Sequence, residues 1–287
     1  YEDYDELQEA TKELKTRASL HLSGTPYRIL MSDEFEPQDI VSFVQYTDIL
    51  QAKNDWDRKY CSGTNSRREI YENPYFGFPT MVRFAFNPSR SALKLIHSLQ
   101  NAGYTSRLSM LLRPKDSKDE NGTVQFEYAE QVLELLYAID GHKPDENILP
   151  FLANKRIQEG KLCRHIVMVL PFRESCDAME QLIAQHSELE NLSQYAILNI
   201  VGRDGKKNYP TPEDIVRAID EYEAQGKKTI TLTVNRMMTG STVPQWDTML
   251  YLKDTHSPQE YDQAIFRLQS PYVKEYEAET CLLYTSD

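Results

Sequence analysis

Residues 165–172 read HIVMVLPF, and this stretch decides the fold class. It is a continuous apolar run with several β-branched side chains, which is typical of a strand buried on both faces. Residues 174–186 (ESCDAMEQLIAQH) follow with the periodicity of an amphipathic helix. The apolar face of that helix comprises Cys176, Met179, Leu182 and Ile183. A buried strand that leads into such a helix is a building unit of parallel sheets.

The same alternation continues toward the C-terminus. Further strands are predicted at residues 195–201 (YAILNIV), 229–234 (TITLTV) and 248–252 (TMLYL). Helices are expected between and after them, so the sequence predicts an α/β fold with a parallel sheet covered on both faces.

The helix before the strand at 229–234 has clear start and stop signals. It is predicted to start at Thr211, with Pro212 at its first position and Asp214 at its third, and to stop before Gly226.

The first part of the chain is less regular. A helix is predicted at residues 5–17 and a short strand at 18–22 (ASLHL). Helical periodicity returns at residues 39–56 and 128–139, and a strand is predicted at 80–86 (TMVRFAF), with polar loops rich in Gly, Pro and Asn around them. We interpret residues 32–160 as a linker and a mixed α+β insertion.

The composition excludes several classes of protein. The chain has 287 residues, 40% of them hydrophobic and 26% charged, which indicates a globular protein. A net charge of −12 argues against a protein that coats nucleic acid by charge alone. No apolar run approaches the roughly 20 residues of a membrane helix. The four cysteines form no CxxC pair, so we predict free thiols, no metal site and a cytoplasmic location.

Two turn-rich segments leave predicted strands at their carboxyl ends, where sites form in open α/β sheets. They are residues 23–28 (SGTPYR) and 239–247 (TGSTVPQWD). The last predicted helix, residues 257–269, places Gln263 and Arg267 together at i, i+4 spacing. Arg is the side chain whose planar fork matches phosphate oxygens. We expect these groups to meet at one edge of the sheet.

Four segments, in order along the chain, resemble motifs III to VI of the superfamily-two helicases. They are LSGTPYR (22–28), IVMVLPFRESCDAMEQLI (166–183), TVNRMMTGSTVPQWDTMLYL (233–252) and SPQEYDQAIFRLQ (257–269). The resemblance is closest to the motor subunits of type I and type III restriction enzymes. It covers about residues 18–31 and 161–275 and implies a RecA-like fold.

The resemblance also implies a division of the chain. Residues 1–31 would end the first RecA-like lobe, residues 32–160 would be inserted, and residues 161–280 would form the second helicase lobe. The chain opens on Tyr1 rather than Met, so we expect it to begin inside a longer protein. The last residues, 281–287 (CLLYTSD), match the translation of a sequencing adapter, and we expect a non-native tail there.

The resemblance implies coupling roles for the two turn-rich segments. Ser23, Gly24 and Thr25 would couple nucleotide state to lobe movement as motif III. Thr239, in motif V, would touch the nucleic-acid backbone.

Other residues would face the nucleotide by the same resemblance. Gly240 and Asp247 would help to bind the cofactor, although the residues themselves favour a structural role for Asp247, as a cap or brace of its loop. Gln263 and Arg267 would be catalytic, with Arg267 stabilising the phosphate charge in the transition state.

The sequence departs from the family pattern at several points. Thr242 and Ser270 stand where the family often has an acid and a second arginine. No GxxxxGK[ST] loop and no acidic Mg²⁺ motif occur, and residues 202–208 (GRDGKKN) are interpreted as a loop. The resemblance therefore implies ATP and Mg²⁺ as cofactors of a longer parent protein, with this chain inactive alone.

The leading hypothesis is a fragment of an ATP-dependent DNA translocase, the motor of a restriction system. Its expected partners are double-stranded DNA and nuclease, methyltransferase or specificity subunits, with no membrane. One alternative is a nucleotide-independent interaction module, a degenerate motor lobe that docks a nuclease or methyltransferase. The other is an RNA helicase.

Overall fold

The computed structural model describes residues 17, 20, 22, 36–62, 68–82, 108–115, 124–141, 152, 155, 162–202, 208–234, 242–255 and 257–273. Contacts within the chain divide it into two units, Tyr1–Phe43 and Val44–Asp287. The described part of the first unit contains the short 3-10 helix η1 (Pro37–Asp39). The elements below all belong to the second unit. The domain boundaries predicted from the sequence stay predictions.

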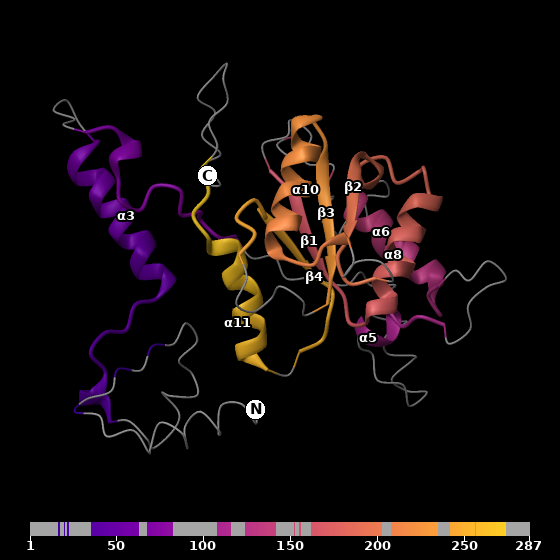
Figure 1. The fold of residues 1–287 in the computed structure, drawn as a ribbon, viewed down its shortest axis with the longest axis horizontal. Helices are drawn as coiled ribbons and strands as arrows, with labels where there is room; N and C mark the ends of the chain where they lie inside the picture. The colour runs from indigo at the N-terminus through magenta and orange to yellow at the C-terminus, as the bar shows by residue number, and fades with distance from the viewer. Residues whose placement is uncertain are drawn as a thin grey trace. The chain divides into compact units, whose positions relative to one another are not determined.

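Four strands form one parallel sheet in the second unit (Figure 1). They are β1 (His165–Val169), β2 (Tyr195–Asn199), β3 (Lys228–Thr233) and β4 (Thr248–Tyr251), in the spatial order β2-β3-β1-β4. All five residues of β1 are buried, as expected of an apolar strand with a neighbour on each side. The predicted α/β class with a parallel sheet is confirmed.

The strand order places the connecting helices on opposite faces of the sheet. The chain crosses from β1 to β2 through α8 (Arg173–Gln185) and returns toward β3 through α10 (Pro212–Ala224). Because parallel crossovers are right-handed, reversing the direction of travel moves the second helix to the other face. Figure 1 shows α8 and α10 on the two sides of the sheet.

The predicted helix signals are confirmed in α10. The Thr211 hydroxyl accepts from the Asp214 amide at 3.4 Å, and the Asp214 carboxylate accepts from the Thr211 amide at 3.0 Å. Pro212 occupies the first position of the helix. Gly226 lies just beyond the end of α10 at φ +73°, a conformation that favours glycine.

The last helix also lies where it was predicted. α11 (Pro258–Phe266) is followed directly by the 3-10 turn η4 (Arg267–Gln269), and the Ser257 hydroxyl accepts from the Glu260 amide at 3.2 Å. Ala264 and Ile265 are buried. α11 therefore faces the protein core with one side only.

Residues 108–115 and 124–141 pack on the same core as the sheet. These segments contain α5 (Leu108–Leu111), an antiparallel bridge between Pro114 and Phe126, and α6 (Ala129–Asp140). Leu112, Phe126, Val132 and Leu136 are all at most 1% exposed and belong to the core cluster of β1 and α8. The predicted helix at 128–139 is confirmed by α6.

A second small cluster surrounds α3 (Tyr46–Tyr60) and η2 (Ile70–Glu72). Asn73 Nδ2 donates to the Lys53 carbonyl at 3.1 Å and to Asp57 Oδ1 at 2.8 Å, and Lys53 Nζ donates to the Phe78 carbonyl at 2.8 Å. These contacts hold the loop after η2 against α3. None of the described helices is long and apolar enough to span a membrane.

Candidate functional site

The carboxyl ends of the parallel strands lie along one edge of the sheet, which we call the carboxyl edge. Residues 170–173 leave β1, residues 200–202 leave β2 and residues 252–255 leave β4. Residues 235–241, which follow β3, lie outside the described residues. In open α/β sheets ligands bind at this edge, so its side chains define the candidate site.

Asn199, the last residue of β2, is the centre of a polar cluster at this edge. Its Nδ2 donates to Asp177 Oδ1 and to Glu180 Oε2 of α8, both at 2.9 Å. Its Oδ1 accepts from the Gly202 amide at 2.8 Å. A Cβ atom at Gly202 would lie 2.1 Å from Asp177 Oδ1 and 2.4 Å from Asn199 Nδ2, so an alanine there would displace these side chains. The cluster fixes the end of β2 against α8.

Arg173 ties the ends of β1 and β2 together. It opens α8, and its Nε donates to the Val201 carbonyl at 2.9 Å. Phe172, next to it, leaves 40% of its surface exposed. A guanidinium and a partly exposed aromatic ring therefore sit side by side in the chain directly after β1.

Asp254, three residues after β4, binds the start of α5. Its carboxylate accepts from the Leu108 amide at 3.2 Å, the Ser109 amide at 2.8 Å and the Ser109 hydroxyl at 2.6 Å. A carboxylate is the preferred partner of unpaired amides at a helix start. Asp254 thus attaches the segment 108–115 to the carboxyl edge.

The start of α11 is fixed to the residues that leave β4. Glu260 accepts from Lys253 Nζ at 2.5 Å and from the Thr255 hydroxyl at 3.0 Å. The rings of Tyr251 and Tyr261 meet edge to face with their centroids 5.5 Å apart. The orientation of α11 therefore follows the position of the β4 exit.

Gln263 and Arg267 keep the i, i+4 relation that the sequence predicts. Gln263 lies in the last turn of α11, and Arg267 is the residue that ends the helix and opens η4. Both are half-buried and both interact with other groups of the chain. Burial lowers the pKa of Arg267. Arg267 lies about 13 Å along the helix axis from the end of α11 that contacts the β4 exit.

Asp247 lies at the opposite, amino edge of the sheet, directly before β4. Its Oδ2 accepts from the Arg164 amide at 2.7 Å, and its Oδ1 accepts from the His165 amide at 3.4 Å. The Asp247 amide in turn donates to the His165 carbonyl at 3.1 Å. Burial raises the pKa of this carboxyl. The geometry therefore makes Asp247 a clamp between β4 and the start of β1.

An ion pair extends this clamp to α10. Arg164 Nη2 lies 2.9 Å from Glu223 Oε1, and the Glu223 side chain is 3% exposed. His165 Nδ1 lies 3.0 Å from Thr229 Oγ1 of β3, and its Nε2 lies 3.7 Å from Glu223. The amino edge thus carries a polar network that joins β1, β3, the residue before β4 and α10.

The other predicted site residues, Ser23, Gly24, Thr25, Thr239 and Gly240, lie outside the described residues. Their roles stay predictions.

The loop directly before β4 is described from Thr242, which is exposed. The loop then turns inward, since Trp246 is 3% exposed and its Nε1 donates to Thr231 Oγ1 of β3 at 3.1 Å. Trp246 therefore belongs to the core.

The described residues differ in how well they suit ATP and Mg²⁺. The amide of Gln263 and the guanidinium of Arg267 are donors of the kind that phosphate oxygens accept. Within the described ranges, no group of three or more His, Cys, Asp or Glu side chains is placed to hold a metal ion. These residues therefore fit a phosphate group, and they do not form a Mg²⁺ site.

Sequence reasoning missed Arg173, Asn199 and Asp254. Arg173 directly follows a predicted strand, Asn199 lies near the end of one and Asp254 lies two residues after one, and these positions were the available signal. Their partners lie 3 to 146 residues away in the chain, and the long-range contacts could not be read from local pattern.

The sequence matches no established protein-family profile. The chain is 26% identical over 291 residues to a Mycoplasma pneumoniae protein. The name of that protein provisionally describes it as the C-terminus of a type II restriction enzyme and methyltransferase. The alignment covers 92% of this chain and 36% of the relative, so the chain spans about a third of the relative's length. The similarity thus extends over nearly the whole chain and includes both the sheet and the segment before it.

Proposed function

We propose that this chain forms a RecA-like lobe of an ATP-dependent DNA motor that serves a restriction–modification system. Two independent findings support the proposal. The parallel sheet, with α8 and α10 on its two faces, is the architecture that the motif resemblance implies. The Mycoplasma pneumoniae relative carries a restriction-enzyme and methyltransferase name.

The observation that carries the proposal is the attachment of α11 to the β4 exit. The segment that resembles motif VI forms α11 and η4, and Glu260 fixes its start through Lys253 and Thr255. The segment that resembles motif V ends in β4 itself. The segments that resemble motifs V and VI are therefore joined through β4 and the contacts of Glu260.

This continuity suggests how the lobe works. ATP, when bound, supplies the phosphate charge and the free energy of hydrolysis. Gln263 and Arg267 would donate hydrogen bonds to phosphate oxygens, with Arg267 balancing their negative charge. A shift of α11 would be transmitted through Glu260 to the β4 exit and from there to the loop that resembles motif V. That loop would hold the DNA backbone.

The proposal requires partners outside these 287 residues. A phosphate-binding loop and Mg²⁺ ligands would come from another segment of the complete protein, since neither motif occurs in this sequence. Double-stranded DNA would be the track. A nuclease or methyltransferase part would supply the restriction or modification chemistry.

The test is steady-state ATP hydrolysis by the complete protein, with and without DNA, in an Arg267→Ala variant. We expect DNA-stimulated turnover to fall by roughly a thousandfold, the usual effect of losing an arginine that stabilises transferred phosphate. Arg217→Ala is the matched control, because Arg217 is a 65%-exposed arginine on α10. Unchanged turnover in the Arg267 variant would remove this residue from catalysis.

One observation favours the second candidate, a nucleotide-independent module that docks a nuclease or methyltransferase. Asp247, one of the residues expected to bind the cofactor, lies at the amino edge and is used in a structural clamp. A complete protein that binds DNA or its partner subunit equally well with and without ATP would support the module.

A further inference from the structure

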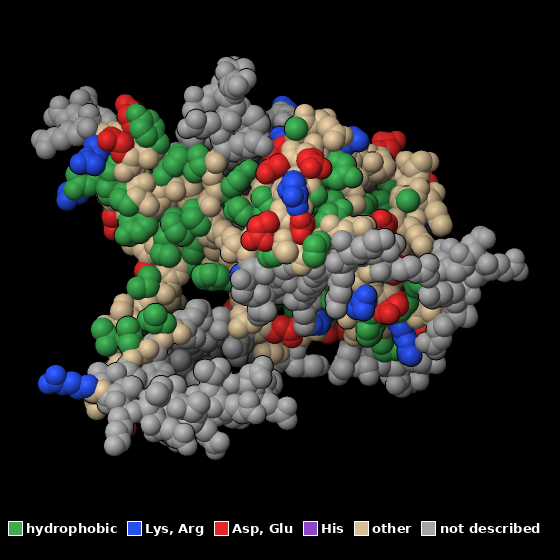
Figure 2. Space-filling view, in the orientation of Figure 1, with side chains coloured by type: hydrophobic (Ala, Val, Ile, Leu, Met, Phe, Trp, Pro, Cys, Tyr) green, Lys and Arg blue, Asp and Glu red, His purple; other side chains and the backbone are tan. Residues whose placement is uncertain are grey.

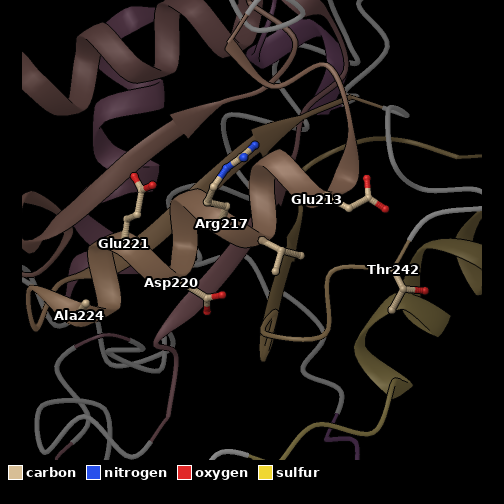
Figure 3. Close-up of a pocket in the computed structure, with 7 residues that line it drawn as sticks. Glu213, Arg217, Asp220, Glu221, Ala224 and Thr242 are labelled. Carbon is tan, nitrogen blue, oxygen red and sulfur yellow. The ribbon is translucent and has the colours of Figure 1, made fainter.

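The exposed side of α10 forms a groove in which Thr242 alone, of the lining residues, belongs to a segment that the proposed motor uses. The groove has a volume of about 460 Å³ and runs along the helix. Its lining residues are Glu213, Val216, Arg217, Asp220, Glu221, Ala224 and Thr242. Figure 3 shows Thr242 facing the first turns of α10 from a separate segment of the chain. The groove therefore lies between a helix and the loop before β4.

The groove combines an apolar lining with acidic side chains. Val216 and Ala224 contribute apolar surface, and Glu213, Asp220 and Glu221 are exposed carboxylates. Arg217, the cation of the lining, is already hydrogen-bonded to Asp214. Figure 2 shows the acidic side chains over α10 gathered around a single basic one. The surface thus carries net negative charge around an apolar strip.

A buried amide gives the groove a second, independent feature. Gln245 is 4% exposed, and its Nε2 donates to Asp220 Oδ1 at 3.2 Å, so its side chain extends toward the groove wall. Its Oε1 is buried and has no hydrogen-bond partner among the described residues. A buried acceptor without a donor is costly. Gln245 thus links the buried side of the loop before β4 to the Asp220 carboxylate of the groove.

We propose that the α10 groove docks a basic amphipathic segment of a partner protein, with Lys or Arg side chains next to an apolar one. The carboxylates match the basic side chains in charge, and the apolar strip between them matches the apolar one. Nucleic acid does not suit the groove, because its phosphates would be repelled by Glu213, Asp220 and Glu221. The inference is independent of ATP hydrolysis, since no lining residue belongs to α11 or the carboxyl edge.

The test is fluorescence anisotropy with the full 287-residue chain and a labelled synthetic peptide that presents Leu and Arg on a helical repeat. A peptide with Glu in place of Arg serves as the charge control. We expect saturable binding of the Arg peptide alone. The double variant Glu213→Lys/Asp220→Lys should weaken it at least tenfold, because two attractions become repulsions.

Because the chain carries a net charge of −12, it would attract any basic peptide without a specific site. The test therefore needs a control for this non-specific attraction. Glu130→Lys/Glu134→Lys on α6 changes the net charge equally at exposed sites, and it should weaken binding less than twofold. If the reversal variant fails to fold, Glu213→Gln/Asp220→Asn should still reduce affinity severalfold. Equal effects of the α6 and α10 variants would overturn the proposal, as would the absence of saturable peptide binding.

Discussion

The role of Asp247 leads to a prediction that separates structure from cofactor binding. In Asp247→Ala, the Arg164 amide loses an acceptor at 2.7 Å and the His165 amide loses one at 3.4 Å. An unsatisfied buried donor costs about 1–3 kcal/mol, and the longer bond counts for less. Removal also relieves the burial of a carboxyl whose pKa is raised. We expect a net destabilisation of about 2 kcal/mol.

The assay is urea unfolding followed by circular dichroism, with the free energy of unfolding extrapolated to water. A loss below about 0.5 kcal/mol, the usual range of surface substitutions, would refute the clamp. Nucleotide affinity of the complete protein, once corrected for stability, should stay unchanged. Weaker nucleotide binding with an unchanged free energy of unfolding would instead support the cofactor role predicted from sequence.

The pH dependence of the free energy of unfolding provides a second test of the burial of Asp247. Because the pKa of Asp247 is raised in the fold, the folded state favours the protonated carboxyl. Its contribution to stability is greatest below the pKa of the unfolded chain and is lost as pH rises through the folded pKa. Relative to Asp247→Asn, which cannot ionise, the parent chain should lose stability as pH rises above the usual pKa of an aspartate. An unchanging difference between the two would contradict the burial of this charge.

Three further predictions concern other parts of the fold. Burial raises the pKa of Cys163 to about 12, so iodoacetamide should react with the partly exposed Cys61 well before it reacts with Cys163. Peptide mass spectrometry measures the two rates, and equal labelling would refute the burial of Cys163. Gly202→Ala should lower the free energy of unfolding by about 1–3 kcal/mol, because the new Cβ meets Asp177 at 2.1 Å; a neutral result in urea titration would contradict the close approach. Hydrogen bonds, first from His186, lower the pKa of Glu188 to about 2, so its contribution to stability should be present above the usual pKa of a glutamate and be lost as pH falls toward 2. In Glu188→Gln, the melting temperature should therefore depend less on pH over this acidic range.

Local signals in the sequence were sufficient to predict the strands of the sheet and the helices that connect them. The apolar run of β1 has all five of its residues buried, and the capping residues Thr211 and Asp214 form the contacts that their spacing predicts. Both signals act over a few residues, where chain geometry alone decides which groups meet.

Long-range contacts could not be predicted in the same way. Asp254 binds α5 from 145 residues away, which depends on how segment 108–115 packs on the core. Asp247 was expected at the carboxyl edge because it shares a loop with Gly240. The loop crosses from the end of β3 to the start of β4, so its last residues lie at the amino edge. A loop between parallel strands connects opposite edges, and its sequence does not show where along it a site would form.

The most direct test of a DNA motor is movement along DNA. A triplex-forming oligonucleotide is annealed to a duplex, and its displacement by the complete protein is followed with and without ATP and Mg²⁺. We predict displacement that requires ATP, is abolished by Arg267→Ala and is retained by Arg217→Ala. DNA binding without any ATP-dependent displacement would contradict the motor and leave an interaction module as the better account of this fold.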